Sequence, residues 1–138
     1  MPAKSVKDLM TPDPATIELE ATVVEAAKRM AQIDVGPLPV VDGNRLIGIV
    51  TDRDLVVRVL AEGRDPKTTA ISEACSEDLV TVSTDDDLRH ALGLLARHQV
   101  RRLPVVDGER LVGIVAQADV ARELDPSAVG NVVEEISR

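Results

Sequence analysis

The sequence predicts a mixed α/β (α+β) fold made of two β-α-β-β-α repeats, and three observations lead to it. Shifting the sequence by 65 positions lays residues 6–60 on residues 71–125 without a gap, and 17 of those 55 pairs are identical. Average composition would give roughly one match in sixteen. Each copy also shows an extended segment before a helical apolar pattern, and then two apolar runs joined by Asp-Gly. We therefore expect one domain over residues 6–62 and a second over 71–125, joined by a linker at 62–69.

The first elements of each copy follow from the spacing of apolar residues. Extended segments are predicted at 15–18 and 80–83. The helices after them repeat apolar residues at intervals of three and four, through Val23, Ala26, Ala27 and Met30 in copy one and Leu88, Ala91, Leu92 and Leu95 in copy two. Thr22-Val-Val-Glu25 and Thr84-Asp-Asp-Asp87 both match the pattern of a capping hydroxyl with an acid three residues later. Thr22 and Thr84 are accordingly the predicted helix caps.

A hairpin and a second helix complete each copy. Two Val/Ile/Leu-rich runs meet at Asp42-Gly43 in copy one and at Asp107-Gly108 in copy two, where glycine accepts the positive φ of a tight turn. A copy of about 55 residues buries little surface by itself. The two copies are therefore expected to pack sheet to sheet about a pseudo-twofold axis, with one shared core.

Two further features concern packing. Cys75 aligns with Met10 on the apolar face of a short leading helix, so it is expected to be a small core residue. Residues 126–138 form a predicted amphipathic helix whose apolar stripe is Val129, Val132, Val133 and Ile136. That stripe is expected either to cover its own domain or to meet another chain.

The composition restricts the partners. The chain has no Phe, Trp or Tyr and a formal net charge of −8, which opposes base stacking and phosphate-backbone binding, so no nucleic-acid partner is expected. A single cysteine and a polar start without a signal peptide favour a cytoplasmic location. No apolar run approaches the roughly 20 residues that cross a bilayer, so no membrane role is expected.

Few residues suggest catalysis or metal binding. Asp85-Asp86-Asp87 could hold a metal, but consecutive acids at a helix start more often cap the helix and face solvent. His90 and His98 lie on a predicted helix without a Ser or Cys nucleophile at a recognisable spacing, and no Gly-x-x-x-x-Gly-Lys phosphate loop occurs. We therefore predict no catalytic residues, no metal site and no enzyme activity.

Both copies carry a Leu-Pro-Val-Val-Asp-Gly segment, at 38–43 and 103–108, followed by Gly-Ile-Val, and copy one continues with Thr51-x-x-Asp54. In this pattern the chain resembles the CBS domain family, in particular the stand-alone tandem pairs (Bateman modules) of bacteria. The resemblance implies a regulatory module that needs no cofactor and binds an adenosine-containing ligand reversibly, such as AMP, ADP, ATP or S-adenosylmethionine. It also implies a homodimeric disc and a protein partner that responds to the ligand.

The resemblance further implies two clefts, each taking its ribose motif from one copy and its base-lining loops from the other. The first cleft would use Thr51, Arg53, Asp54, Leu79, Val80, Val100, Arg101 and Arg102. These residue types suit the ligand: the Asp54 carboxylate can accept both hydroxyls of a ribose. Thr51 begins a helix where a phosphate is favoured, and arginine has a planar fork that fits phosphate.

The second cleft departs from the family pattern. It would use Ala15, Val35, Gly36, Pro37 and Asp119, and it has Ala116 and Ala118 where copy one has Thr51 and Arg53. It is expected to take an uncharged adenosine compound or nothing.

Each site residue has a simpler interpretation. Asp54 and Asp119 could serve only as acids that favour a helix start, and Thr51 could be a plain cap. On that view the chain would be a ligand-free structural module acting through the surface of its dimer.

Overall fold

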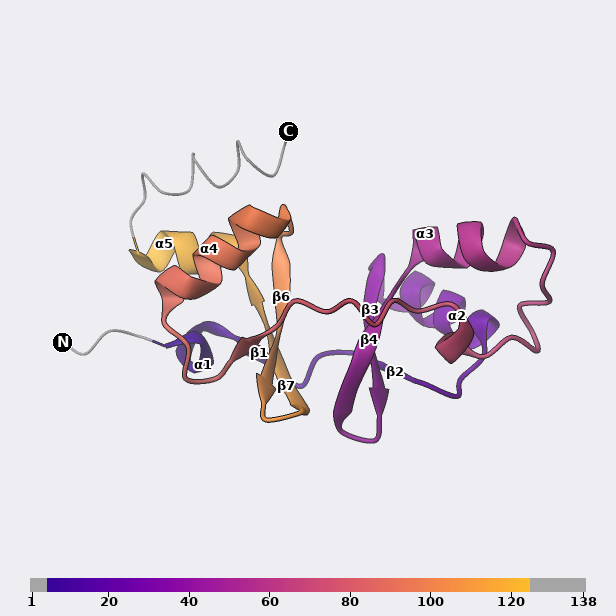
Figure 1. Cartoon of the computed structure of the whole chain (residues 1–138), viewed down its shortest axis with the longest axis horizontal. Coiled ribbons are helices and arrows are strands. Elements are labelled where there is room, and N and C mark those ends of the chain that lie inside the picture. The colour runs from indigo at the N-terminus through magenta and orange to yellow at the C-terminus, as the bar shows by residue number, and fades with distance from the viewer. Residues whose placement is uncertain (1–4, 125–138) are drawn as a thin grey trace. The chain divides into compact units, whose positions relative to one another are not determined.

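The computed structural model describes residues 5–124, which divide into two compact units (Figure 1). We call Ala15–Leu79 the continuous unit. The other, which we call the composite unit, joins the segment that ends at Pro14 to the segment that begins at Val80. Each unit has its own apolar core, so the prediction of one shared core is wrong.

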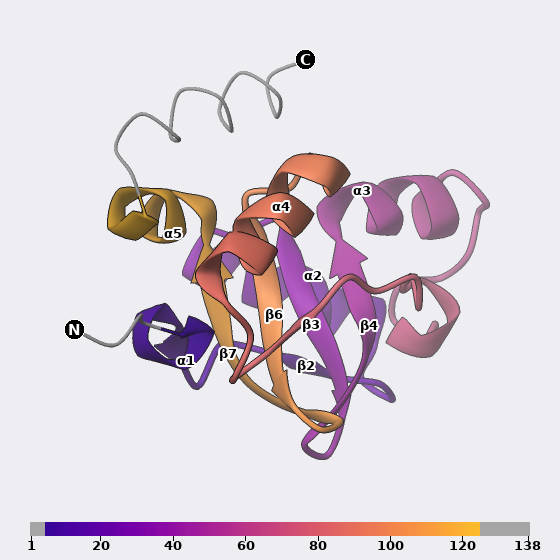
Figure 2. The same ribbon diagram turned by 60° about the vertical axis from the view of Figure 1, so that its left-hand side comes forward.

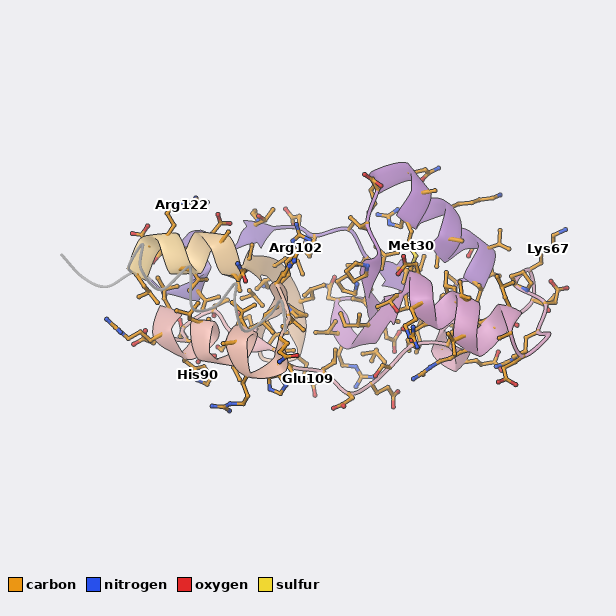
Figure 3. The ribbon with its side chains drawn as sticks, turned by 90° about the horizontal axis from the view of Figure 1, so that it is seen from above. Met30, Lys67, His90, Arg102, Glu109 and Arg122 are labelled. Atoms are coloured by element: carbon orange, nitrogen blue, oxygen red, sulfur yellow. The ribbon has the colours of Figure 1, made fainter. Side chains whose placement is uncertain are left out.

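The continuous unit is a three-stranded mixed sheet with helices on one side. Its strand β2 (Ile17–Glu18) runs parallel to β3 (Pro37–Asp42), which is antiparallel to β4 (Arg45–Thr51). Helix α2 (Val23–Ile33) and the helical run α3 (Asp52–Asp54) and η1 (Leu55–Leu60) lie on the same side of the β3-β4 hairpin (Figures 1 and 3). Met30 points from α2 into this interior (Figure 3) and is buried. A short 3-10 turn, η2 (Ile71–Glu73), ends the unit's helical elements.

The composite unit repeats this plan. Strand β5 (Val82–Ser83) is parallel to β6 (Arg102–Asp107), and β6 is antiparallel to β7 (Arg110–Ala116). Helices α4 (Leu88–His98) and α5 (Gln117–Leu124) cover one side of this hairpin, while α1 (Val6–Leu9) lies beside α5 (Figure 2). A short strand β1 (Thr11–Pro12) is antiparallel to β7.

The two repeats exchange their leading segments. Val6 is fully buried in the core formed by copy two, and Leu9 and Met10 pack against that core. In the same way, Ile71, Ala74 and Cys75 belong to the core of copy one. The compact units therefore cut across the repeats, because each repeat supplies its first apolar turn to the other.

The predicted order of elements in each copy is confirmed, and so is the mixed α+β class. Gly43 and Gly108 both have φ of +65°, as the predicted hairpin turns require. Cys75 is buried as predicted, and burial raises the pKa of its thiol. The predicted helix at 126–138, with its stripe of Val129, Val132, Val133 and Ile136, lies outside the described residues.

One predicted helix cap is confirmed and the other is wrong. The Thr22 hydroxyl accepts from the Glu25 N–H at 3.2 Å, and the Glu25 carboxylate accepts from the Thr22 N–H at 2.9 Å. In copy two the cap is Asp87, whose carboxylate accepts from the Arg89 N–H at 2.8 Å, and not Thr84. The 65-residue shift places Asp87, not Thr84, opposite Thr22, so the local pattern at Thr84 was a coincidence of composition.

Within residues 5–124, no helix has both the length and the apolar character to cross a bilayer. The linker lies on the surface of the continuous unit, where Lys67 projects outward (Figure 3). Arg64 anchors this linker through an ion pair with Glu73, which also lowers the pKa of the Glu73 carboxyl.

The exchanged segments approach the hairpins at two glycines. Ile49 and Ser76 exchange two backbone hydrogen bonds of 2.9 Å, and a Cβ on the neighbouring Gly48 would meet the Ser76 carbonyl oxygen at 2.4 Å. At the matching place in copy two, a Cβ on Gly113 would lie 2.6 Å from the Met10 sulfur and 2.9 Å from the Thr11 carbonyl oxygen. Only a residue without a Cβ lets these backbones meet.

We expect Gly48→Ala to lower the free energy of unfolding by about 1–3 kcal/mol, because the added methyl meets a backbone atom that cannot move independently. The measurement is calorimetric unfolding, since the chain has no aromatic reporter. Gly93→Ala is the matched control, because nothing lies within 4 Å of its Cβ position on α4. That change should stabilise the protein by about 0.5–1 kcal/mol. Equal effects of the two substitutions would contradict the close approach at Gly48.

Candidate functional site

The start of the second helix in copy one forms a reciprocal pair between Thr51 and Asp54. The Thr51 hydroxyl accepts from the Asp54 N–H at 3.1 Å, and the Asp54 Oδ2 accepts from the Thr51 N–H at 2.9 Å. This pair satisfies two backbone donors that a helix start leaves unpaired. The simpler interpretation of Thr51 as a helix cap is therefore correct, and the question is what else the pair can bind.

Sequence reasoning missed Arg58, which holds the other oxygen of the Asp54 carboxylate. Its Nε lies 3.6 Å from Asp54 Oδ1, and its Nη1 donates to the Cys75 carbonyl oxygen at 3.4 Å. The Asp54 side chain is consequently only 18% exposed. The spacing of four residues between an acid and a base on one helix was the signal that could have found Arg58.

The loop before β3 meets the same corner. The Asp52 N–H donates to the Gly36 carbonyl oxygen at 3.1 Å, and the Asp52 Oδ1 accepts from the exposed Arg53 N–H at 3.0 Å. Within the continuous unit, Val35, Gly36 and Pro37 thus stand next to the turn that carries Thr51 and Asp54. This contact fixes the backbone at the helix start from a second side.

The corresponding corner of copy two is looser. Asp119 is 44% exposed, and its Oδ1 accepts from Arg122 Nη1 at 3.4 Å. Arg122 itself points away from α5 into solvent (Figure 3). The Gln117 N–H donates to the Arg101 carbonyl oxygen at 2.8 Å, the counterpart of the Asp52–Gly36 bond. The Gln117 Oε1 is buried without a hydrogen-bond partner among the described residues, a feature that the sequence did not reveal.

The predicted site residues are divided between the two units. Of the first cleft, Thr51, Arg53, Asp54 and Leu79 belong to the continuous unit, and Val80, Val100, Arg101 and Arg102 belong to the composite unit. Of the second cleft, Ala15, Val35, Gly36 and Pro37 are in the continuous unit, and Asp119 is in the composite unit. The structure brings together Thr51 and Asp54, while the meeting of the two halves of each cleft stays a prediction.

Two of the three consecutive acids bind backbone N–H groups near the start of α4. Asp87 caps α4, and the Asp86 carboxylate accepts from the Ser83 N–H at 2.8 Å. In residues 5–124 no three side chains of His, Cys, Asp or Glu gather as metal ligands would. His90 lies 3.9 Å from the Asp86 carboxylate on the helix surface.

Comparison with known families decides the identity of the repeat. The sequence model described as "CBS domain" matches twice, over residues 6–61 and 71–126. The chain belongs to the CBS domain family. The bounds of the two CBS domains agree closely with the two sequence repeats.

Stand-alone CBS proteins are among its relatives. The CBS domain-containing protein YhcV of Bacillus subtilis is 44% identical over 134 residues, which are 96% of this chain and 95% of that protein. A solved structure of Hypoxic Response Protein I, with two coordinated zinc ions, is 37% identical with a TM-score of 0.79. The match covers 88% of this chain and 99% of that one.

Other similar CBS structures contain adenosine compounds. CBSX2 in complex with AMP is 26% identical with a TM-score of 0.74, over 94% of this chain and 98% of that chain. The CBS domain pair of protein MJ0100, in complex with 5′-methylthioadenosine and S-adenosyl-L-methionine, is 29% identical. Its TM-score is 0.68, over 88% of this chain and 95% of that chain. CBS pairs of this kind thus bind adenosine ligands.

Proposed function

We propose that the chain is a regulatory module without catalytic activity that binds one adenosine-containing ligand reversibly, with its ribose at Asp54. The observation that carries the proposal is the reciprocal Thr51–Asp54 pair, which presents a fixed and largely buried carboxylate at a helix start. Copy two has no equivalent pair, because position 116 is alanine.

The Asp54 carboxylate keeps capacity for a ribose. Each of its oxygens has two lone pairs, and the structure uses one on Oδ2 for the Thr51 N–H and places Arg58 beside Oδ1. Two further hydrogen bonds, one per oxygen, are what a vicinal diol offers. Because the side chain is mostly shielded from water, these bonds are stronger than they would be at an exposed acid.

The Thr51 hydroxyl is suited to a ligand phosphate. Its oxygen accepts from the Asp54 N–H, so its own hydrogen is available to donate. Arg53, Arg101 and Arg102 are all exposed and supply the positive charge that a phosphate requires in a protein of net charge −8. A phosphorylated ligand such as AMP is therefore favoured over S-adenosylmethionine at this site.

We further propose that the module is a homodimer, which is compatible with control of a protein partner. The helical run η1 exposes three large apolar side chains, Val56, Val57 and Leu60. The matching positions of copy two are Ala121, Arg122 and Asp125, so this apolar face occurs only in copy one. An exposed apolar cluster on a charged surface is typical of a contact between proteins, and a second copy is the occupant we propose.

The first test of function is unfolding by calorimetry with and without about 1 mM AMP. A ligand at 100 times its dissociation constant stabilises the fold by about 2.7 kcal/mol, which is several degrees for a chain of this size. Asp54→Asn should reduce that shift strongly without removing it, because the amide has one oxygen acceptor in place of two and no charge, while the Thr51 hydroxyl still caps the helix. Asp119→Asn is the matched control and should leave the shift unchanged. No shift with the unaltered protein would favour the alternative, a ligand-free structural module.

A second test concerns the phosphate. We expect one AMP to bind per chain. Replacing both Arg101 and Arg102 by Ala should lower the affinity for AMP by a factor of roughly a hundred, because two charge-assisted hydrogen bonds are lost. Adenosine should be affected far less, because it has no phosphate. Isothermal titration measures both ligands, and AMP affinity should also fall as salt rises. Two equivalent sites per chain, or equal losses for the two ligands, would refute the assignment.

The dimer is tested by light scattering at micromolar concentration. The unaltered chain should have the mass of two copies, and Val57→Glu should give a monomer because it places a charge in the apolar cluster. The exposed Ile33→Glu on α2 is a control for the general effect of an added acid and should leave the dimer intact. A dimer that tolerates Val57→Glu would place the contact elsewhere.

A further inference from the structure

We infer that Arg58 is a positioning residue for ribose recognition: it fixes the Asp54 carboxylate in the orientation that distinguishes a ribose from a sugar without hydroxyls. The inference rests on the proposed function, and it adds a residue that contacts the carboxylate rather than the ligand. It also accounts for a proposed difference in ribose binding between the copies, although both have an acid at the same position.

The contacts of Arg58 tie two segments of the continuous unit together. Its Nε faces Asp54 Oδ1 at 3.6 Å, and its Nη1 donates to the Cys75 carbonyl oxygen at 3.4 Å. Cys75 is buried and lies two residues after the end of the turn η2. One guanidinium therefore connects the Asp54 carboxylate with the exchanged leading segment. Two of its nitrogens contact different partners, so the planar shape of the group matters as well as its charge.

The winding of the helix supports a special role for this position. Residues Leu55–Leu60 form a π-helix, in which the Ala61 N–H donates to the Val56 carbonyl oxygen at 2.8 Å. Such turns are rare and occur frequently at functional sites. The equivalent helix of copy two, α5, is α-helical over Gln117–Leu124. The widened turn begins directly after Asp54 and carries Arg58.

Copy two cannot build the same arrangement. Its residue at the position of Arg58 is Glu123, which has the same charge as Asp119. Asp119 pairs instead with Arg122, one residue earlier, and both side chains remain substantially exposed. Both copies thus have an acid at this position, but only in copy one do Thr51 and Arg58 hold its carboxylate.

Fixing a carboxylate increases its selectivity. With Oδ2 accepting from the Thr51 N–H and Oδ1 at 3.6 Å from Arg58 Nε, rotation of the group about its last bond is restricted, which favours one direction for its free lone pairs. A pair of ribose hydroxyls then binds without the entropic cost of ordering the acceptor. Removing Arg58 should weaken recognition of the hydroxyls while leaving the rest of the ligand's contacts intact.

The experiment is isothermal titration of the full chain with adenosine, 2′,3′-dideoxyadenosine and AMP. The unaltered protein should prefer adenosine over the dideoxy compound. Arg58→Ala should reduce that preference by roughly two- to fivefold, the loss expected for one partly exposed ion pair, with little change for the dideoxy compound. Arg122→Ala in copy two is the matched control and should change nothing.

Two further variants keep the test independent of folding. If Arg58→Ala does not fold, Arg58→Lys takes its place in the test. Lysine retains the charge beside Asp54, so this variant should keep part of the preference for adenosine over the dideoxy compound. In an Asp54→Asn background, Arg58→Lys should have no further effect on adenosine, because the group that it positions is gone. An additive effect there would overturn the inference.

The outcomes separate this inference from the proposed function. No binding of adenosine or AMP by the unaltered chain overturns both. Binding with an equal loss of adenosine and dideoxyadenosine in the Arg58 variants would show a purely structural role, and a loss confined to AMP would show a direct phosphate contact. Either result overturns the positioning role while leaving the ribose site at Asp54 in place.

Discussion

The approach of two backbones at Gly48 and Ser76 is the constraint on which the continuous unit depends. The pair of hydrogen bonds between Ile49 and Ser76 requires a strand surface without a Cβ, and Gly48 provides it. This contact brings Ile71, Ala74 and Cys75 into the core of copy one. Gly113 allows Met10 and Thr11 to reach β7 in the composite unit. Neither repeat has a complete core without the leading turn of the other, so the duplication is a structural necessity for this fold.

The exchanged leading segment of copy two also contacts the candidate site. Cys75 is held in the core by the exchanged segment, its carbonyl oxygen accepts from Arg58, and Arg58 faces the carboxylate that Thr51 also holds. A ligand on Asp54 would therefore act on a carboxylate linked to the segment that leads to Leu79. A ligand shifts a conformational equilibrium only if it prefers one of the two states. If Asp54 is the ribose acceptor, as proposed, movement of the 71–79 segment would alter the support of its carboxylate through Arg58.

Much of the fold could be predicted from the sequence because its signals are local. Apolar spacing predicted α2 and α4, and Asp-Gly predicted both hairpins, since each depends on neighbouring residues. The exchange of leading turns was not predicted, because periodicity shows which face of a turn is apolar and not which core receives it. Thr51 and Asp54 were predicted as a pair, whereas Arg58 was not, because an acid and a base four residues apart are common on exposed helix faces and do not by themselves indicate a binding site. Thr84 was mistaken for a cap although the repeat itself pointed to Asp87.

The two copies match in the strands and differ in the helix that follows. From Val35 to Asp54, 13 of 20 positions match copy two, but from Leu55 to Leu60 none does. The strands keep their residues because buried alternation and the glycine contacts tolerate little change. The helix that follows is exposed on one side, and there copy two has Ala116 at the position of the cap hydroxyl and Glu123 at the position of the arginine. Both copies have the acid, and an acid stabilises a helix start without any ligand. An acid at this position is therefore weak evidence for a ribose site, and the combination of Thr51, Asp54 and Arg58 is the stronger criterion.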